Sequence, residues 1–507
     1  MFSFLLCIPM CSSQKDKKNI VTISPDDTME EIVHKAANVV PSPRQLAWQE
    51  LELTAFACFS MNTFTDKEWG DGNEDPGLFN PIEFDAGQWA KICRDAGMRM
   101  IILTTKHHDG FCLWPSKFTE HSVKNSSWKN GKGDVVGEVA EACREHGLRF
   151  GVYLSPWDKH EASYGDTPKY NEFFKNQLRE LLTNYGEIAE VWFDGACGEG
   201  PNGKRQAYDW QGYYGVIREL QPDAVIAIMG PDVRWVGTES GYGRETEWSV
   251  IPVEFQEQDK IAEESQHKPV EKAFVPKDMT LKDFGSRSKI KKAQALAWYP
   301  SEVDVSIRPG WFYHQSQDDK VKSPEKLLDI YFSSVGRNSL LLLNIPPDRR
   351  GLIHENDIKA LQGWRTILDS LFSVNFVKDA KCRSSNSARR HGIEKTIDGK
   401  KNTYWTTEEG VERVALEYNF TKRKEIDVVM LQENIRVGQR IEKFHLEAWI
   451  AGKWKKIADG TTVGYKRLLC FPTVKTSCIR ISITKSRSNP TLTNVGFFKL
   501  PEELIEN

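Results

Sequence analysis

The chain has 507 residues, and 39% of them are hydrophobic, so it can bury large cores and is not globally disordered. At roughly 150 residues per domain, this length accommodates two or three domains. The formal net charge is −3, which excludes a strongly basic nucleic-acid-binding protein and gives no reason to expect electrostatic capture of phosphate groups.

The N-terminal residues form a short apolar run that ends at Cys11 and is followed by a polar, charged stretch. This arrangement resembles a bacterial lipoprotein signal with lipid attached to Cys11. The run is too short to span a bilayer, and no other segment approaches the length of a membrane helix. We therefore expect residues 1–20 to be a signal segment. The protein is then exported to the periplasm or the cell surface, with a lipid anchor and no membrane span.

From about residue 45, apolar runs typical of strands alternate with helical stretches. Strands that alternate with helices imply parallel β-α units, and runs this apolar indicate burial on both faces. About eight such units favour a (β/α)8-like TIM barrel of the α/β class, which we place at residues 45–370. The segment 255–295 is rich in Gln, Glu and Lys and is expected to be a long loop. The expected strands are 55–59, 98–105, 148–154, 188–193, 224–229, 296–299 and 340–343.

The pattern changes after about residue 372. Short alternating runs such as 426–431, 444–449 and 478–483 are separated by turn residues, and no long helix is evident. This pattern predicts an all-β sandwich or jelly roll, which we place at residues 375–501.

Polar, titratable and aromatic residues recur where the expected barrel strands end. The C-terminal ends of barrel strands carry the reacting groups in such folds, so these residues are candidates for one site. Five strand ends with this character indicate a shared site more strongly than a single His pair does. The segments that follow the first five strands are 62–69, 106–114, 153–157, 192–195 and 230–239.

Asp194 is the sharpest single candidate, because it directly follows an apolar strand, where an unpartnered carboxylate is costly. The alternative is an Asp that caps the following Asp-Gly turn. If Asp194 acts in glycoside hydrolysis, that reaction needs a second carboxyl group. Asp232, Glu239, Glu245 and Glu247 are available in the later loops, and the pattern does not choose among them.

The segment 191–195, taken with 107–111, resembles glycoside hydrolase family 29, the α-L-fucosidases. The resemblance covers roughly residues 45 to 370 and includes 62–70, 306–313 and 340–347 in order. Within the family, the motifs 62–70, 230–239 and 308–313 look most like the subgroup that prefers α-1,3/1,4-linked fucose on branched glycans.

The resemblance implies a retaining exo-glycosidase that acts on an oligosaccharide or glycoconjugate and needs no cofactor. Asp194 would be the nucleophile and Glu239 the acid/base, with their carboxyl groups about 5–5.5 Å apart. His107 and His108 would bind the fucose hydroxyls. The other implied pocket residues are Glu68, Trp69, Tyr153, Trp192, Arg234 and Trp311, with Trp311 against the C6 methyl group.

One position departs from the family pattern. The first strand of the family usually ends in a His that contacts fucose, and Cys58 stands there in this chain. A thiol is a weak hydrogen-bonding group compared with imidazole, so the affinity and the preferred sugar are open.

The C-terminal region resembles the coagulation factor 5/8 type C domains through segments such as 396–399, 403–406 and 437–444. Trp405 and Phe444 fall in framework-like motifs and are expected in the core rather than on a ligand platform.

Two alternative functions remain. One is a carbohydrate-binding protein with weak or no hydrolysis, for which Cys58 is the only support. The other is a glycosidase for a related sugar, such as a galactoside. A metal hydrolase is disfavoured, because His107 and His108 are adjacent and adjacent side chains are expected to diverge. We therefore expect no metal site.

Overall fold

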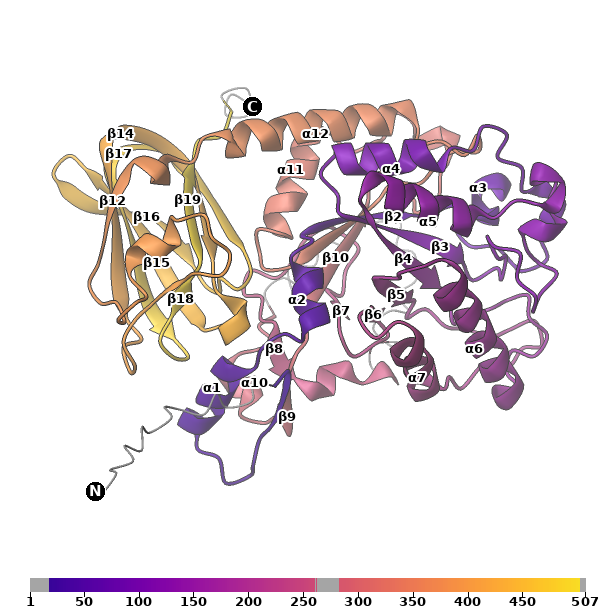
Figure 1. The fold of residues 1–507 in the computed structure, drawn as a ribbon, viewed down its shortest axis with the longest axis horizontal. Helices are drawn as coiled ribbons and strands as arrows, with labels where there is room; N and C mark the ends of the chain where they lie inside the picture. The colour runs from indigo at the N-terminus through magenta and orange to yellow at the C-terminus, as the bar shows by residue number, and fades with distance from the viewer. Residues whose placement is uncertain (1–17, 260, 262–281, 502–507) are drawn as a thin grey trace, which may run out of the picture.

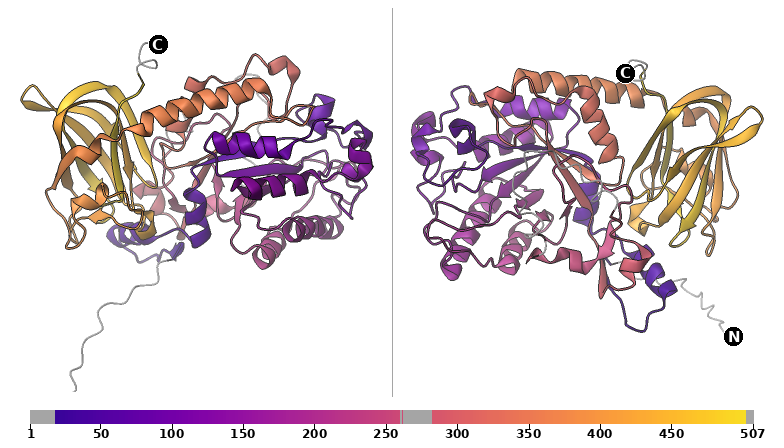
Figure 2. Two further views of the ribbon diagram at one scale, coloured as in Figure 1. Left: turned by 45° about the horizontal axis from the view of Figure 1, so that its top comes forward. Right: turned by 180° about the vertical axis from the view of Figure 1, so that it is seen from behind.

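The computed structural model describes residues 18–259, 261 and 282–501 and consists of an α/β barrel followed by a β-sandwich. The barrel fills the right half of Figure 1, and the sandwich lies beside it on the left. Helix α12 (Glu355–Ser373) runs along the barrel and leads into the sandwich in every view of Figures 1 and 2. The predicted fold class is confirmed, whereas the predicted lipid-attachment residue, Cys11, lies outside the described residues.

The barrel sheet has eight parallel strands, in the order β6-β5-β4-β3-β2-β11-β10-β7. Its strands are apolar along most of their length, which suits a sheet that packs on helices outside and on its own side chains inside. The strands are β2 (Leu53–Ala57), β3 (Met100–Lys106), β4 (Arg149–Leu154), β5 (Glu190–Phe193), β6 (Val225–Ile228), β7 (Arg234–Trp235), β10 (Ser301–Ser306) and β11 (Leu340–Asn344).

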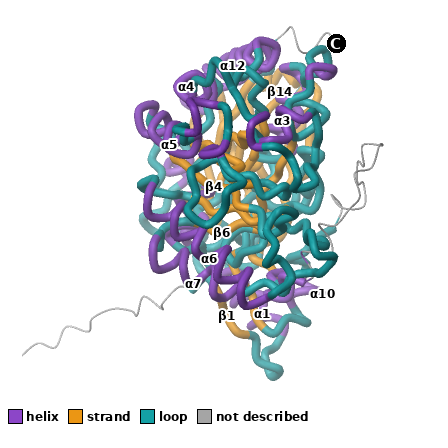
Figure 3. Tube along the Cα trace, turned by 90° about the vertical axis from the view of Figure 1, so that its right-hand side faces the viewer, coloured by secondary structure: helices purple, strands orange, loops and turns teal. Residues whose placement is uncertain are grey.

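Helices lie outside this sheet (Figure 3). Several begin at side chains that cap the first turn. Asp85 accepts a hydrogen bond from the Gln88 amide at 2.9 Å, and Asp134 accepts one from Gly137 at 2.9 Å. The helices of the barrel region are α2 (Pro43–Gln49), α3 (Met61–Thr65), α4 (Ala86–Asp95), α5 (Val135–His146), α6 (Thr167–Asn184), α7 (Trp210–Leu220), α11 (Pro324–Ser333) and α12. Figure 3 shows α12, α4, α5, α6 and α7 along the top and left of the strands.

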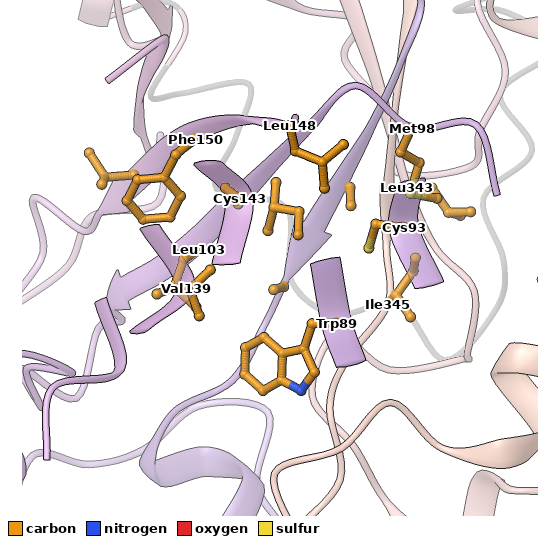
Figure 4. Packing of buried hydrophobic residues seen from close by; sticks show 14 of the residues in the cluster. Trp89, Cys93, Met98, Leu103, Val139, Cys143, Leu148, Phe150, Leu343 and Ile345 are labelled. Carbon is orange, nitrogen blue, oxygen red and sulfur yellow. The ribbon is translucent and has the colours of Figure 1, made fainter. Parts of the chain in front are cut away.

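The main core lies between these helices and the sheet. In Figure 4, Trp89 of α4 and Val139 of α5 face Leu103 of β3 and Phe150 of β4, and all four are nearly or fully buried. Burying each such side chain contributes about 1.5–3 kcal/mol. This layer holds the strands rigidly, and the strands in turn position the residues at their ends.

The barrel is closed without strand pairing between β6 and β7. The Asp232 carboxylate accepts the Ile226 N–H at 2.9 Å, a hydrogen bond that a neighbouring strand would otherwise accept. Arg44 and Arg218 form ion pairs with Asp232. Gln45 of α2 donates from Nε2 to the carbonyls of Asp232 and Trp298, each at 2.8 Å. Helix α2 therefore seals the seam, and Asp232 has a structural role.

The expectation that 296–299 is a barrel strand was wrong. This segment is β9 (Ala295–Trp298), which pairs antiparallel with β1 (Ile20–Thr22) and β8 (Val250–Pro252) in a small separate sheet. Helices α1 (Met29–Asn38) and α10 (Arg287–Ile290) pack near this sheet. The barrel strands that the sequence pattern missed are β7, which has two residues, and β10, in which Glu302 and Asp304 interrupt the apolar pattern.

The C-terminal domain has a six-stranded antiparallel sheet and a two-stranded sheet, with a core between them. Trp405 and Phe444 have no exposed surface, which confirms them as core residues. The strands are β12 (Ala380–Ser384), β13 (Trp405–Thr406), β14 (Val414–Gln432), β15 (Ile441–Ile450), β16 (Lys453–Gly460), β17 (Arg467–Ser486), β18 (Thr491–Leu492) and β19 (Asn494–Phe498).

The eight cysteines in the described part of the chain are all free. No helix in that part is long and apolar enough to cross a membrane.

Candidate active site

A cavity of ≈ 110 Å³ opens at the C-terminal ends of the barrel strands. A larger cleft of ≈ 600 Å³ lies elsewhere, between the opposite end of the barrel and the sandwich, and contains none of the predicted site residues. The grouping of carboxyl, imidazole and indole groups identifies the smaller cavity as the site. Its lining residues are Phe56, Cys58, Glu68, Trp69, Thr104, His107, His108, Tyr153, Trp192, Asp194, Ala196, Ile228, Trp235, Glu239, Asp304, Trp311 and Phe312.

All the residues predicted for the site line this cavity except Arg234. Arg234 is buried, forms an ion pair with Glu247 and lies 5.6 Å from the ring centroid of Phe284. Of the four acids left open for the second carboxyl, Glu239 alone lines the cavity.

Asp194 directly follows β5, and two neutral donors fix its carboxyl group. The Tyr153 hydroxyl donates to Oδ2 at 2.9 Å, and the Ala196 amide donates to Oδ1 at 2.8 Å. Burial raises the pKa of Asp194, while these hydrogen bonds and the nearby His107 oppose that shift. The carboxyl group is therefore oriented but only partly compensated, as a reactive group requires.

Glu239 lies in the loop after β7 and is exposed at the edge of the cavity. Trp311 Nε1 donates to its Oε2 at 3.1 Å. The surrounding protein raises the pKa of Glu239 by removing water from the carboxyl group, and the negative charges of Asp194 and Glu68 raise it further. Glu68 in turn accepts the Trp311 backbone N–H at 2.9 Å, so Trp311 is held by Glu239 at its indole and by Glu68 at its backbone.

The two adjacent histidines have different hydrogen-bond partners. Ser155 Oγ lies 2.7 Å from His108 Nδ1 and donates its single hydrogen to the Trp157 carbonyl, so His108 donates from Nδ1. Asn62 Nδ2 lies 3.2 Å from His107 Nδ1 and donates to it. Burial lowers the pKa of His107, and burial with Lys159 and Lys106 lowers the pKa of His108 to about 3.

Both imidazoles are therefore neutral at neutral pH, with opposite tautomers. Nε2 of His107 is a donor, and Nε2 of His108 is an acceptor. The rings lie side by side, with centroids 4.1 Å apart, so the expectation that adjacent side chains diverge was wrong here. A pair with one donor and one acceptor is suited to sugar hydroxyls, which both donate and accept.

His107, His108 and Asp194 each offer a ligand atom within 4.8 Å of the other two, so this group could hold a metal ion by its donor types. The charge around it is less favourable, because Lys106 and Lys159 lie close enough to His108 to lower its pKa. A divalent cation would add positive charge beside these two ammonium groups.

Cys58 directly follows β2 and is 4% exposed in the wall of the cavity. Burial, and then the nearby Glu68 and Asp194, raise the pKa of the thiol well above its usual value. Cys58 therefore remains a neutral thiol and contributes a small, weakly polar surface where an imidazole would offer a stronger hydrogen bond.

Several lining residues were not predicted, and Asp304 and Trp235 are the most polar of them. Trp235 Nε1 donates to Asp304 Oδ1 at 2.8 Å. The alternation in Ser301–Ser306 is the signal that could have found Asp304, since residues 302 and 304 share a face in a strand. The remaining unpredicted residues are Phe56, Thr104, Ala196, Ile228 and Phe312.

The site combines a partly buried carboxyl group, Asp194, and an exposed one, Glu239, with neutral imidazoles and aromatic walls. These groups can carry out acid/base chemistry on a bound sugar. The two acids, one directly after β5 and one in the loop after β7, are the minimum that glycoside hydrolysis requires. Aromatic faces and paired donors and acceptors supply the binding surface for a pyranose ring.

Comparison with known proteins agrees with this chemistry. The sequence profile of the family Alpha-L-fucosidase matches residues 43–368, and that of the F5/8 type C domain matches residues 380–495. Alpha-L-fucosidase 1 of Arabidopsis thaliana is 42% identical over 467 residues, which are 90% of this chain and 87% of that protein.

Solved structures of similar proteins also support the fucosidase family. A Bacteroides ovatus protein is 49% identical with a TM-score of 0.83, and the match covers 95% of this chain and 78% of that one. A Ruminococcus gnavus GH29 fucosidase in complex with fucose is 32% identical with a TM-score of 0.80, and the match covers 92% of this chain and 96% of that one. The chain therefore belongs to the α-L-fucosidases of glycoside hydrolase family 29, with an F5/8 type C domain behind the catalytic barrel.

Proposed function

We propose that this α-L-fucosidase is a retaining exo-enzyme that removes terminal α-1,3- or α-1,4-linked fucose from branched glycans. The observation that carries the proposal is that Asp194 and Glu239 line one cavity and that the charge of Asp194 raises the pKa of Glu239. The fucose complex of the Ruminococcus gnavus relative supports the sugar.

In the first step, an Asp194 oxygen attacks the anomeric carbon, and the glycosidic C–O bond breaks. Glu239 transfers its proton to the leaving oxygen. In the second step, Glu239 takes a proton from water, the water oxygen attacks the anomeric carbon, and the Asp194 ester bond breaks. Fucose leaves with its original α-configuration, and both carboxyl groups return to their starting protonation states.

The two carboxyl groups need opposite charges at the start of this cycle. Asp194 must be ionised, and its negative charge favours the protonated form of Glu239. The cost of two negative charges in one small cavity favours a single proton between the two acids, and the two hydrogen bonds that Asp194 accepts favour its ionised form, which leaves the proton on Glu239. The neutral His107 and His108 bind hydroxyl groups without changing this balance.

The choice of sugar follows from the aromatic part of the cavity. Trp311 is held by Glu68 and Glu239 and offers an apolar face for the C6 methyl group of fucose. An apolar contact of this kind discriminates against a 6-hydroxyl by only about a hundredfold, so a galactoside remains the competitor to test. The linkage preference rests on the motifs 62–70, 230–239 and 308–313.

Azide rescue tests the two roles separately. On an aryl fucoside with a good leaving group, Asp194→Ala should lose roughly 10⁴-fold or more in kcat and form β-fucosyl azide, since azide then attacks the substrate directly. Glu239→Ala should form α-fucosyl azide, because azide replaces water on the fucosyl-enzyme. Glu245→Ala is the matched control, since Glu245 does not line the cavity, and should give fucose only. The same azide anomer from both catalytic variants would overturn the assignment.

A substrate panel tests the linkage and the sugar. The wild type should release fucose from Lewis-type trisaccharides faster than from an α-1,2-linked fucoside, and faster than it releases galactose from the matching galactoside. No release from any fucoside, together with measurable fucose binding by calorimetry, would instead support a carbohydrate-binding protein, for which Cys58 is the structural argument.

We also propose that the protein is exported and carries a lipid on Cys11, on the basis of the apolar run before that residue. Expression of the full chain in a bacterium that processes lipoproteins should give a detergent-phase protein, and Cys11→Ser should move it to the aqueous phase. An aqueous wild type would contradict the anchor.

A further inference from the structure

Asp304 is a carboxyl group in the active-site cavity that the double-displacement mechanism does not use. It lies on β10, is 4% exposed and lines the cavity together with Asp194 and Glu239. Trp235 Nε1 donates to its Oδ1 at 2.8 Å, which leaves Oδ2 as the oxygen that can carry a proton. A carboxyl group beside the two catalytic acids needs a defined charge state, because its charge would act on both of them.

The surroundings of Asp304 favour its neutral form. The titratable groups that act on it are Glu239, from the loop after β7, and Glu302, two residues earlier on the same strand. Asp304 also acts on the Cys58 thiol, which lies after β2. On the other side, β11 places Leu342 at the paired position. Within the part of the chain that the structure describes, no ion pair reaches Asp304.

A buried aspartate with a cation shows the contrast. Asp158 is equally buried, and Lys106 Nζ lies 2.9 Å from its Oδ2. The net effect lowers the pKa of Asp158 despite its burial. Among the described residues, the Trp235 indole is the side chain that hydrogen-bonds to Asp304, and the charged groups that act on it are acids. Burial raises the pKa of Asp304 well above the usual range.

We propose that Asp304 is a substrate-binding residue in its neutral acid form, which donates a hydrogen bond from its carboxyl O–H to an oxygen of the bound glycan near Glu239. The proposal rests on the proposed function, since the acceptor is an oxygen of the fucoside. A neutral Asp304 also adds no negative charge that would oppose the ionisation of Asp194.

Two substitutions distinguish a neutral Asp304 that donates a hydrogen bond from an ionised Asp304. Asp304→Asn keeps an acceptor for Trp235 and a donor for the sugar, and removes only the ability to ionise. Asp304→Ala removes both the acceptor for Trp235 and the donor for the sugar. We expect Asp304→Ala to lower kcat/KM by about 10- to 100-fold, mostly through KM, and Asp304→Asn to lower it by clearly less than that. The basic limb of the kcat/KM profile, which reports Glu239, should stay at the same pH in Asp304→Asn.

An ionised Asp304 would give a different result. Its removal in Asp304→Asn would lower the pKa of Glu239 and move the basic limb to lower pH, and it would reduce kcat/KM as much as Asp304→Ala does. Either observation would overturn the proposal, and so would wild-type kinetics in Asp304→Ala.

A second measurement does not depend on turnover. The infrared difference spectrum of wild type minus Asp304→Asn, at pH 7 and without substrate, should contain the C=O band of a protonated carboxyl group. Asp369→Asn is the matched control, because that aspartate is exposed on α12 and paired with Arg365, and it should contribute no such band. A carboxylate band for Asp304 would refute the neutral form, whereas a wild type inactive on all fucosides would refute the proposed function alone.

Discussion

At the scale of single residues, the interior of the barrel pairs acids with tryptophan indoles. Each pair joins a neutral N–H donor to a carboxyl group, which orients both side chains without fixing the charge of the acid. Three of the four indoles line the cavity, so the acids hold its aromatic walls in place. The pairs are Trp48 with Glu190 at 2.7 Å, Trp192 with Glu302 at 2.7 Å, Trp235 with Asp304 at 2.8 Å and Trp311 with Glu239 at 3.1 Å.

The Tyr153 hydroxyl belongs to the same scale and has a measurable effect on pH dependence. Tyr153→Phe removes the donor to Asp194 Oδ2 and should raise the pKa of Asp194 further. A hydrogen bond to a charged group contributes about 1.5–3 kcal/mol, so the acid limb of kcat/KM should move up by about 1–2 pH units. Activity should therefore fall at low pH and be retained in part at high pH, because the proposed nucleophile Asp194 must be ionised.

The control for this prediction is Tyr164→Phe. The Tyr164 hydroxyl bonds to the Gly198 carbonyl and to Tyr208, and Tyr164 does not line the cavity. Its removal should leave the acid limb in place. An acid limb that is unchanged in Tyr153→Phe would contradict the role of this hydroxyl.

At the scale of elements, helix α2 is part of the barrel although it precedes the first barrel strand. Its buried face contributes Gln45 and Trp48, which reach the seam and the interior of the barrel. Gln45 uses all its hydrogen-bonding capacity, since Nε2 donates to two carbonyls and Oε1 accepts from the Ser42 amide and hydroxyl. This helix replaces the missing pairing between β6 and β7.

Gln45→Ala should therefore destabilise the protein more than the loss of a helix cap does. It leaves the carbonyls of Asp232 and Trp298 without these donors in a buried seam, so we expect a loss of about 2–4 kcal/mol in the free energy of unfolding. Ser42→Ala removes the cap alone and should cost about 1 kcal/mol. Denaturant unfolding followed by tryptophan fluorescence compares the two, and equal losses would exclude a special role for the seam.

At the scale of the whole molecule, the sandwich is joined to the barrel by a shared core. Val428, Met430, Leu468 and Phe498 of the sandwich belong to the hydrophobic cluster of the barrel. The ring of Phe498 meets Phe372 of α12 edge-on at 5.1 Å. A continuous apolar contact of this kind couples the unfolding of two domains.

We expect the wild type to unfold in one calorimetric transition. Phe498→Ala should split or broaden this transition, because it opens a cavity between the domains. Phe497→Ala is a matched control on the same strand, since Phe497 faces the core of the sandwich itself, and it should shift one transition downward without splitting it. Two separate transitions in the wild type would contradict the coupling.

The sequence by itself determined much of the fold and the site. Alternating apolar runs and helices identified the parallel barrel, because the period of a buried strand and of a helix is a local property. The first five strands and the change to an all-β pattern after residue 372 were predicted for the same reason. Motifs at strand ends led to Asp194 and the His pair, since the ends of parallel strands meet at one face.

Only the tertiary structure decided the rest. The residue pattern left Glu239 open beside Asp232, Glu245 and Glu247, and the family resemblance implied Glu239. Only the structure shows that it alone of the four lines the cavity, because a loop's path depends on distant contacts. Strand β10 escaped prediction because its acids face a polar interior, which removes the apolar pattern that marks a buried strand. The charge states of Asp194 and Asp304 likewise depend on burial and on neighbours from other strands, which no local pattern records.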